Sequence, residues 1–170
     1  YYLAPTGGND SNPGTISQPW ATWSKAIRMA YPGDTVYIRG GKYYHTSSSG
    51  VTIIPDDGIG RAGTKTQPIS YIGYPPDVLS GNKPIIDCIG YPTDVSYMQG
   101  MRLRKNANYI ILKDFDIINV IQSPTAPGFH NGLYIAGSNN VTVINVTVRN
   151  IGGAGFGVSG DSITFINCDA

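Results

Sequence analysis

A short motif of glycine followed by an apolar, a variable and a second apolar residue recurs along the chain. It occurs at Gly50-Val-Thr-Ile, Gly100-Met-Arg-Leu, Gly132-Leu-Tyr-Ile and Gly155-Phe-Gly-Val. Alternate side chains of a β-strand point to opposite faces, so the apolar pair of each motif enters a core while the middle residue faces outward. Stacking of these strands would align their middle residues in one outward column: Thr52, Arg102, Tyr134 and Gly157.

The last two copies of the motif belong to a longer repeat within residues 132–170. Each copy continues through a polar turn into a second strand-like segment, Val141-Thr-Val-Ile-Asn in the first copy and Ile163-Thr-Phe-Ile-Asn in the next. The copies are 23 residues apart, measured from Gly132 to Gly155. Repetition of short β-rich runs at such a period is typical of a β-solenoid. Asn145 and Asn167 occupy the same turn of successive repeats, where an amide ladder explains them without a function.

Further strand-like segments fill the space between the motifs. They include Asp34-Thr-Val-Tyr-Ile-Arg, Pro68-Ile-Ser-Tyr-Ile-Gly, Pro84-Ile-Ile-Asp-Cys-Ile-Gly and Asn108-Tyr-Ile-Ile-Leu-Lys-Asp-Phe-Asp-Ile. Three short strands in each coil favour an all-β, right-handed parallel β-helix over a sandwich, which would show hairpins and no repeat. We therefore expect residues 1–170 to form a single domain, with an N-terminal cap and first strand in 1–46 and coils in 47–170.

One helix and several long insertions interrupt the strands. The apolar residues of Ala21 to Tyr31 fall on one helical face, Thr22 is a candidate N-cap, and Pro32-Gly33 would stop the helix. This helix would cap the open end of the solenoid. Insertions are expected at about 55–67, 73–83 and 121–131, and such excursions usually lie on a binding face.

Composition narrows the possible functions. Charged residues make up 14% of the chain, the net charge is +1, and all 11 acids are Asp. This balance argues against nucleic-acid binding, which needs a basic stripe. We also expect no transmembrane helix, because the sequence has no apolar run of about 18 residues. A glycoside hydrolase would need two carboxylates about 5 to 10 Å apart on a groove, and the outward column offers none.

Two stretches of the sequence resemble known polysaccharide-degrading enzymes. The start, with Tyr2-Leu-Ala-Pro, Gln18-Pro-Trp-Ala-Thr and Pro32-Gly-Asp-Thr-Val-Tyr-Ile-Arg-Gly-Gly, resembles the N-terminal cap of extracellular parallel β-helix enzymes. The segment Asn145 to Ala170, with Gly155-Phe-Gly-Val and Ile166-Asn-Cys-Asp-Ala, resembles polysaccharide lyase family 9. That family includes pectate lyases and rhamnogalacturonan lyases.

The resemblance implies calcium-assisted β-elimination on the galacturonate-containing backbone of a pectic polysaccharide. In the family a lysine acts as base and an aspartate cluster holds calcium, which neutralises the uronate carboxylate. No run of this chain resembles those motifs, so the catalytic lysine and the calcium ligands are expected beyond Ala170. The resemblance also implies a secreted bacterial protein, extracellular or periplasmic, that is monomeric at full length.

The candidate substrate-binding residues lie on the outward column and next to it. Arg102 could pair with a uronate carboxylate, Tyr134 could stack on a sugar face, and Gly157 would leave room for the glycan. The family's catalytic lysine occupies the same outward place in its own strand. His130 and Asn131 close an insertion directly before Gly132 and could reach the groove. The alternative interpretation is that these are ordinary surface residues.

The remaining acids suit structural roles better. Asp56 and Asp57 form the only adjacent acid pair and are expected in a solvated loop, while Asp114 and Asp116 are expected to satisfy turn amides. The leading hypothesis is the N-terminal portion of a pectin-degrading lyase. The alternative function is a non-catalytic β-helix that binds glycan or serves as a structural or adhesin protein.

Overall fold

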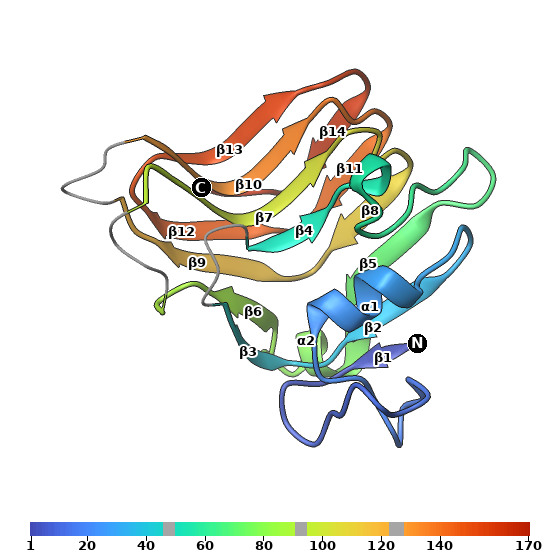
Figure 1. Cartoon of the computed structure of the whole chain (residues 1–170). Helices are drawn as coiled ribbons and strands as arrows, with labels where there is room; N and C mark the ends of the chain where they lie inside the picture. The colour runs from blue at the N-terminus through green and yellow to red at the C-terminus, as the bar shows by residue number, and fades with distance from the viewer. Residues whose placement is uncertain (46–49, 91–94, 123–127) are drawn as a thin grey trace.

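The chain folds into a parallel β-helix built from three sheets, as the repeats predict (Figure 1). The computed structural model describes residues 1–45, 50–90, 95–122 and 128–170. Every pair of neighbouring strands in the three sheets is parallel. Parallel strands require a crossover between partners, and here the crossover is the remainder of each coil.

Four coils each contribute one strand to each sheet, and β1 and β14 extend the first sheet at its two ends. The first sheet contains β1 (Tyr2–Leu3), β2 (Thr35–Ile38), β5 (Ile69–Gly73), β8 (Ile110–Lys113), β11 (Val141–Ile144) and β14 (Ile163–Ile166). The second contains β3 (Gly41–Tyr44), β6 (Pro84–Asp87), β9 (Asp116–Val120) and β12 (Thr147–Ile151). The third contains the glycine motifs, in β4 (Val51–Ile53), β7 (Tyr97–Arg104), β10 (Phe129–Ala136) and β13 (Ala154–Ser159). The prediction of three strands per coil is confirmed.

Apolar side chains stack along the interior at matching positions of successive coils. In the first sheet Val36 pairs with Tyr71, Tyr71 with Leu112, and Leu112 with Val143. All four side chains are completely buried. Full burial of an apolar side chain contributes about 1.5–3 kcal/mol, so each coil is stabilised chiefly by the coils on either side of it.

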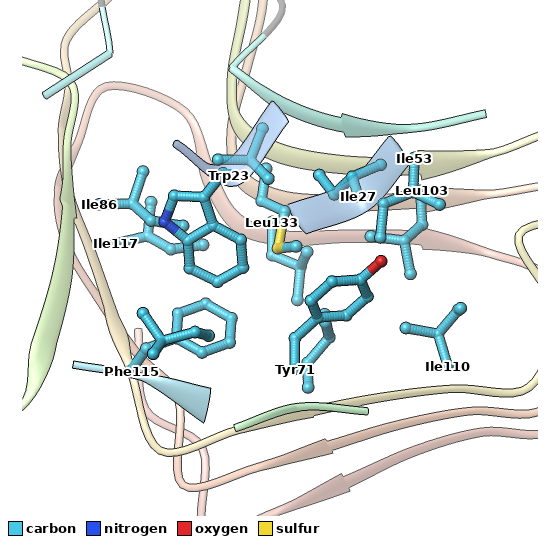
Figure 2. Packing of buried hydrophobic residues seen from close by; sticks show 14 of the residues in the cluster. Trp23, Ile27, Ile53, Tyr71, Ile86, Leu103, Ile110, Phe115, Ile117 and Leu133 are labelled. Carbon is cyan, nitrogen blue, oxygen red and sulfur yellow. The ribbon is translucent and has the colours of Figure 1, made fainter. Parts of the chain in front are cut away.

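Helix α1 (Trp23–Met29) covers the interior at the N-terminal end of the stack (Figure 1). Thr22 caps it by accepting a hydrogen bond from the Lys25 amide, as predicted. Figure 2 shows Trp23 and Ile27 projecting from the helix into the core. The Trp23 ring lies 5.6 Å from that of Phe115 and 6.2 Å from that of Tyr71. The helix therefore seals the first coil with a cluster of aromatic rings.

The boundaries of the irregular segments differ from the expectations. The helix ends before Ala30, short of Tyr31, because the Ala30 backbone is already extended at ψ 132°. The insertion at 55–67 contains a 3-10 helix, η1 (Pro55–Asp57), and that at 73–83 contains α2 (Pro75–Leu79). The expected insertion 121–131 is wrong at its end, because residues 129–131 belong to β10; residues 123–127 lie outside the described structure.

The repeated asparagines occupy a tight turn that recurs from coil to coil. Asp114, Asn145 and Asn167 all have left-handed backbones, with φ of 60°, 52° and 52°. Asn and Asp tolerate this conformation better than other non-glycine residues because their short polar side chains bond locally. The Asn145 amide donates to the Asp114 carboxylate at 2.6 Å. The shared turn is confirmed, and the Asn145–Asp114 bond links two of its three copies along the axis of the stack.

Candidate substrate-binding groove

The predicted outward column is confirmed by the register of the third sheet. Thr52 pairs with Arg102, Arg102 with Tyr134, and Tyr134 with Gly157. The residues on either side of Thr52, Arg102 and Tyr134 are buried, as Leu133 and Ile135 are beside Tyr134, whereas Val158 beside Gly157 is 45% exposed on the last strand of this sheet. The four middle residues therefore follow one another along the axis on the outer face of the sheet formed by β4, β7, β10 and β13; Figure 1 labels these four strands.

The glycines of the motif explain why this face is bent. A Cβ at Gly132 would lie 2.0 Å from Val148 Cγ1, and one at Gly100 would lie 2.3 Å from Ile117 Cγ2. Both glycines thus face the core, and so does the residue after each, Leu133 or Met101. Two successive inward positions break the alternation of an ordinary strand. Each long strand is thereby divided into one arm before the glycine and one arm after it.

A groove of about 410 Å³ lies between the two arms of β7 and β10. The arm before the bend contributes two aromatic rings and two amides, and the arm after it contributes two guanidinium groups and a phenol. The lining residues are Tyr97, Gln99, Arg102, Arg104, Phe129, Asn131 and Tyr134. No acidic side chain and no lysine lines the groove in the described part of the chain.

The positive charge of the groove comes from two arginines on one strand. Arg102 donates through Nε to the Thr52 hydroxyl at 3.0 Å, which fixes the direction of its side chain. Arg104 follows two residues later and therefore faces the same side of the strand, and it also lines the groove. Both side chains are half-buried. Guanidinium groups held in this way favour carboxylate ligands, because they bind both carboxylate oxygens at once.

Gly157 allows two candidate side chains to converge on its strand. A Cβ at this position would lie 2.7 Å from Asn131 Nδ2 and 3.0 Å from Tyr134 Cδ2. The amide and the phenol ring of β10 therefore lean over the backbone of β13. The structure thus brings Asn131, Tyr134 and Gly157 together with Arg102 around one surface.

His130, the remaining candidate, is not among the residues that line the groove. The sequence places it in a loop that could reach the groove, but it lies within β10 and its side chain is only 1% exposed. It pairs with the buried Met98 of β7, and its Nδ1 lies 3.3 Å from the Gly128 carbonyl oxygen. The expectation of a surface histidine is wrong because the strand begins before the glycine and alternation turns His130 inward.

Several acids of the described residues are engaged in structural contacts. Asp116 bonds to Lys83 at 2.8 Å and to Arg149 at 2.9 Å, rather than to the turn amides expected for it. Burial opposes ionisation of Asp87, but hydrogen bonds from Asn119 and Lys42 outweigh it and hold the pKa of Asp87 below its ordinary value.

The acid pair of the 55–67 insertion also has partners. Asp57 pairs with Lys105 at 2.7 Å, and Asp56 accepts a hydrogen bond from Asn106 at 3.0 Å. Within the described ranges no three His, Cys, Asp or Glu side chains gather closely enough to hold a metal ion. Calcium requires six to eight oxygen ligands, so the described residues do not fit a calcium site.

Four lining residues were missed by the sequence interpretation: Tyr97, Gln99, Arg104 and Phe129. A signal for most of them was present. In both strands the glycine is preceded by an aromatic residue, then a residue that is buried in the structure, then an amide residue: Tyr97-Met-Gln-Gly and Phe129-His-Asn-Gly. Extending the motif backward by three residues would have found this arm of the groove.

Taken together, the fold and this groove define a β-helix protein with a cationic and aromatic surface across one parallel sheet. The model of the family described as the Pel9A-like, right-handed β-helix region matches residues 1–170, and the chain belongs to that family. The predicted handedness and the resemblance to polysaccharide lyase family 9 are thereby confirmed.

Individual relatives agree with this assignment. The chain is similar to pectate lyase PEL9 of Emericella nidulans, with 28% identity over 169 residues that cover 95% of the chain and 36% of the relative. A solved rhamnogalacturonan lyase superposes with a TM-score of 0.69 at 23% identity, over 99% of this chain and 50% of that one. A GH136 lacto-N-biosidase from Eubacterium ramulus reaches 0.65 at 20% identity, over 97% and 30%.

The chain matches only part of the length of each of these proteins. It spans about a third of the curated relative and half or less of the two solved proteins. The two structural likenesses describe the fold, because a β-helix accommodates unrelated reactions in its loops. Among the described residues, no helix has the length and apolar character needed to cross a bilayer.

Proposed function

We propose that this chain is the N-terminal portion of a secreted polysaccharide lyase that cleaves a galacturonate-containing pectic backbone by β-elimination. The observation that carries the proposal is the groove itself, where two arginines and three aromatic rings meet with no acid among them. Membership of the Pel9A-like family supports the reaction class. The positive charge of the groove suits a polyanionic glycan better than an uncharged one.

In this proposal the chain binds and orients the substrate. Arg102, held by Thr52, donates to a uronate carboxylate and offsets its charge. Tyr134 packs against a sugar face, Asn131 bonds to hydroxyl groups, and Gly157 keeps the surface low enough for the glycan to pass. Correct placement of a reacting sugar can contribute several kcal/mol to catalysis.

The base and the metal are assigned to residues outside 1–170. Ion pairs engage Lys42, Lys83 and Lys105, and no lysine of the described residues lines the groove. A calcium ion held by such residues would neutralise the uronate carboxylate and make its α-proton easier to remove. No step assigned to the residues of this chain depends on that ion.

A hydrolase is a poorer match to the same surface. Glycoside hydrolysis generally uses two carboxylates roughly 5 to 10 Å apart across the scissile bond, and the groove has no carboxylate among the described residues. The second candidate function is non-catalytic glycan binding, which the arginines and exposed aromatics would serve equally well. The two candidates differ in whether the glycan is cleaved.

The deciding experiment measures unsaturated uronate by its absorbance at roughly 235 nm, following proton abstraction and elimination. The full-length protein is incubated with polygalacturonate and with rhamnogalacturonan, with and without a calcium chelator. We expect an absorbance increase on one or both substrates that the chelator abolishes. Binding of a glycan without any absorbance change on either substrate would exclude the lyase and favour the binding protein.

Arg102→Ala tests the role given to this chain. We expect KM to rise about tenfold, the loss of one charge-assisted contact, with a smaller change in kcat. Thr52→Ala is the matched comparison, because it removes one hydrogen-bond partner of Arg102 and keeps the guanidinium, so KM should rise less than in Arg102→Ala. An unchanged KM in Arg102→Ala would remove Arg102 from the binding site.

A further inference from the structure

In the arm of the groove before the bend, an aromatic residue and an amide residue occur at the same positions of two neighbouring strands. Tyr97 of β7 is in register with Phe129 of β10, and Gln99 is in register with Asn131. The aromatic pair is exposed, Tyr97 at 46% and Phe129 at 81%. The amide pair lies deeper, since Gln99 is 6% and Asn131 8% exposed. Two exposed rings and two deeper amides thus line this arm, and the Gln99 amide nitrogen donates to the Phe129 carbonyl oxygen at 3.3 Å.

An exposed aromatic beside buried amides matches the surface of an uncharged sugar. The C–H face of a pyranose is apolar and covers an aromatic ring, while its hydroxyl groups bond to amide donors and acceptors. Large apolar side chains left open on a groove commonly mark a ligand contact. This arm contains no cationic side chain to attract a carboxylate.

The cations lie on the opposite arm and at one level of the stack only. Arg102 and Arg104 both belong to β7. At the positions paired with Arg102 the neighbouring strands carry Thr52 and Tyr134, and at the position paired with Arg104 β10 carries Ala136. Adjacent strands are about 4.8 Å apart, a spacing comparable with the length of one sugar along a glycan. A glycan with a carboxylate on every sugar would therefore meet guanidinium groups at only one level.

We propose that Phe129, at the level of β10, forms a stacking subsite for an uncharged sugar, adjacent to a uronate bound at the level of β7 by Arg102 and Arg104 across the groove from Tyr97. The groove then prefers a backbone in which uronates alternate with uncharged sugars, as in rhamnogalacturonan, over a backbone of consecutive uronates. This inference rests on the proposed function for its choice of pectic ligands. It adds the residues that distinguish the two backbones.

The test uses oligosaccharide binding measured by calorimetry on the full-length protein in the presence of a chelator, so that calcium-dependent cleavage does not interfere. Two probes of equal length are compared, one alternating galacturonate with rhamnose and one of galacturonate alone. In Phe129→Ala we expect affinity for the alternating probe to fall about three- to tenfold, the loss of one ring contact. Affinity for the galacturonate probe should change less than twofold.

Control variants separate this result from a general loss of structure or of charge. Tyr44→Ala removes another exposed ring, 65% exposed on β3 and outside the groove, and should leave both affinities unchanged. Arg104→Ala should weaken both probes, because both carry a uronate. Thermal unfolding of each variant confirms that the protein is folded.

The possible failures are distinguishable. Equal weakening of both probes by Phe129→Ala would overturn the preference for an alternating backbone, and no weakening of either would overturn the stacking subsite. Each of these leaves the lyase standing if the unsaturated product still forms. Failure of the proposed function is a separate result: the wild-type protein would then form no unsaturated product from either pectic substrate.

Discussion

Replacement of Gly132 by alanine tests the packing that bends the groove. The added Cβ would lie 2.0 Å from Val148 Cγ1 and 2.8 Å from the Gly155 carbonyl oxygen. Carbon atoms pack favourably at about 3.5–4.0 Å, so the backbone of β10 or the side chain of Val148 must move by about 1.5 Å. Gly132 is not among the residues with positive φ, and the penalty is therefore steric rather than conformational.

The expected cost follows from the position of the clash. Overpacking of a well-filled core costs about 1–3 kcal/mol, and the upper part of that range applies because one of the two contacts is backbone. For a chain of this size each kcal/mol shifts Tm by about 2–4 °C. Gly132→Ala should therefore lower Tm by roughly 5–10 °C.

A double-mutant cycle with Val148→Ala isolates the contact. Val148 is 1% exposed, so its truncation alone should cost about 2 kcal/mol. In the double variant the methyl group added in place of the Gly132 hydrogen occupies the space vacated by Val148, and the combined cost should be at least 1 kcal/mol less than the sum. Equilibrium unfolding in urea, followed by circular dichroism and by tryptophan fluorescence, measures each free energy.

Gly81→Ala serves as the control for adding a methyl group elsewhere. No atom lies within 4 Å of its added Cβ, and its φ of 82° carries only the backbone penalty of about 1–2 kcal/mol. That penalty should add to Val148→Ala without any coupling. A Gly132→Ala variant within 0.5 kcal/mol of wild type, or an additive cycle with Val148→Ala, would refute the steric explanation of the bend.

Two further predictions concern an ion pair and the outward glycine. Hydrogen bonding from Arg39 at 2.6 Å holds the pKa of Asp77 below its ordinary value. The stabilisation is then fully present above the unfolded pKa of about 3.9 and lost as pH falls through the folded pKa. Asp77→Asn should cost about 1 kcal/mol at pH 7 and nearly nothing near pH 2 in urea unfolding. Asp161→Asn is the exposed control, and a pH-independent difference for Asp77→Asn would contradict the assignment. Gly157→Ala should change stability by about 1 kcal/mol, because its added Cβ meets side-chain atoms of Asn131 and Tyr134 and no backbone. It should nevertheless raise KM for the pectic substrate severalfold, and an unchanged KM would remove Gly157 from the groove.

The outward column could be predicted from the sequence because it depends only on local rules. Alternation within a strand decides which residue faces outward, and the repeated glycine sets the register between strands. These two rules place Arg102, Tyr134 and Gly157 correctly without any knowledge of loops. The capping helix was predictable for the same reason, since Trp23 and Ile27 lie on one face and Thr22 precedes them.

The arm before the bend could not be placed by the same rules. Alternation fails at Gly132, where two successive residues face inward, and it therefore assigns no face to the residues before the glycine. His130 was taken for a loop residue because the expected insertion 121–131 included it, whereas β10 begins at Phe129. Asp116 shows a second limit, because its partners Lys83 and Arg149 come from other coils and only the folded register brings them together.

The glycine motif therefore carries two separate requirements within a few residues. The first glycine faces the core, where any side chain would meet Ile117 or Val148, and it shapes the strand. The middle residue faces outward: the arginine of β7 and the tyrosine of β10 line the groove, and the glycine of β13 is next in the same column. A methyl group added at the first position should reduce stability, and one added at the middle position of β13 should reduce binding. Stability and recognition can thus vary independently in this fold, and successive coils can differ in chemistry while their register stays the same.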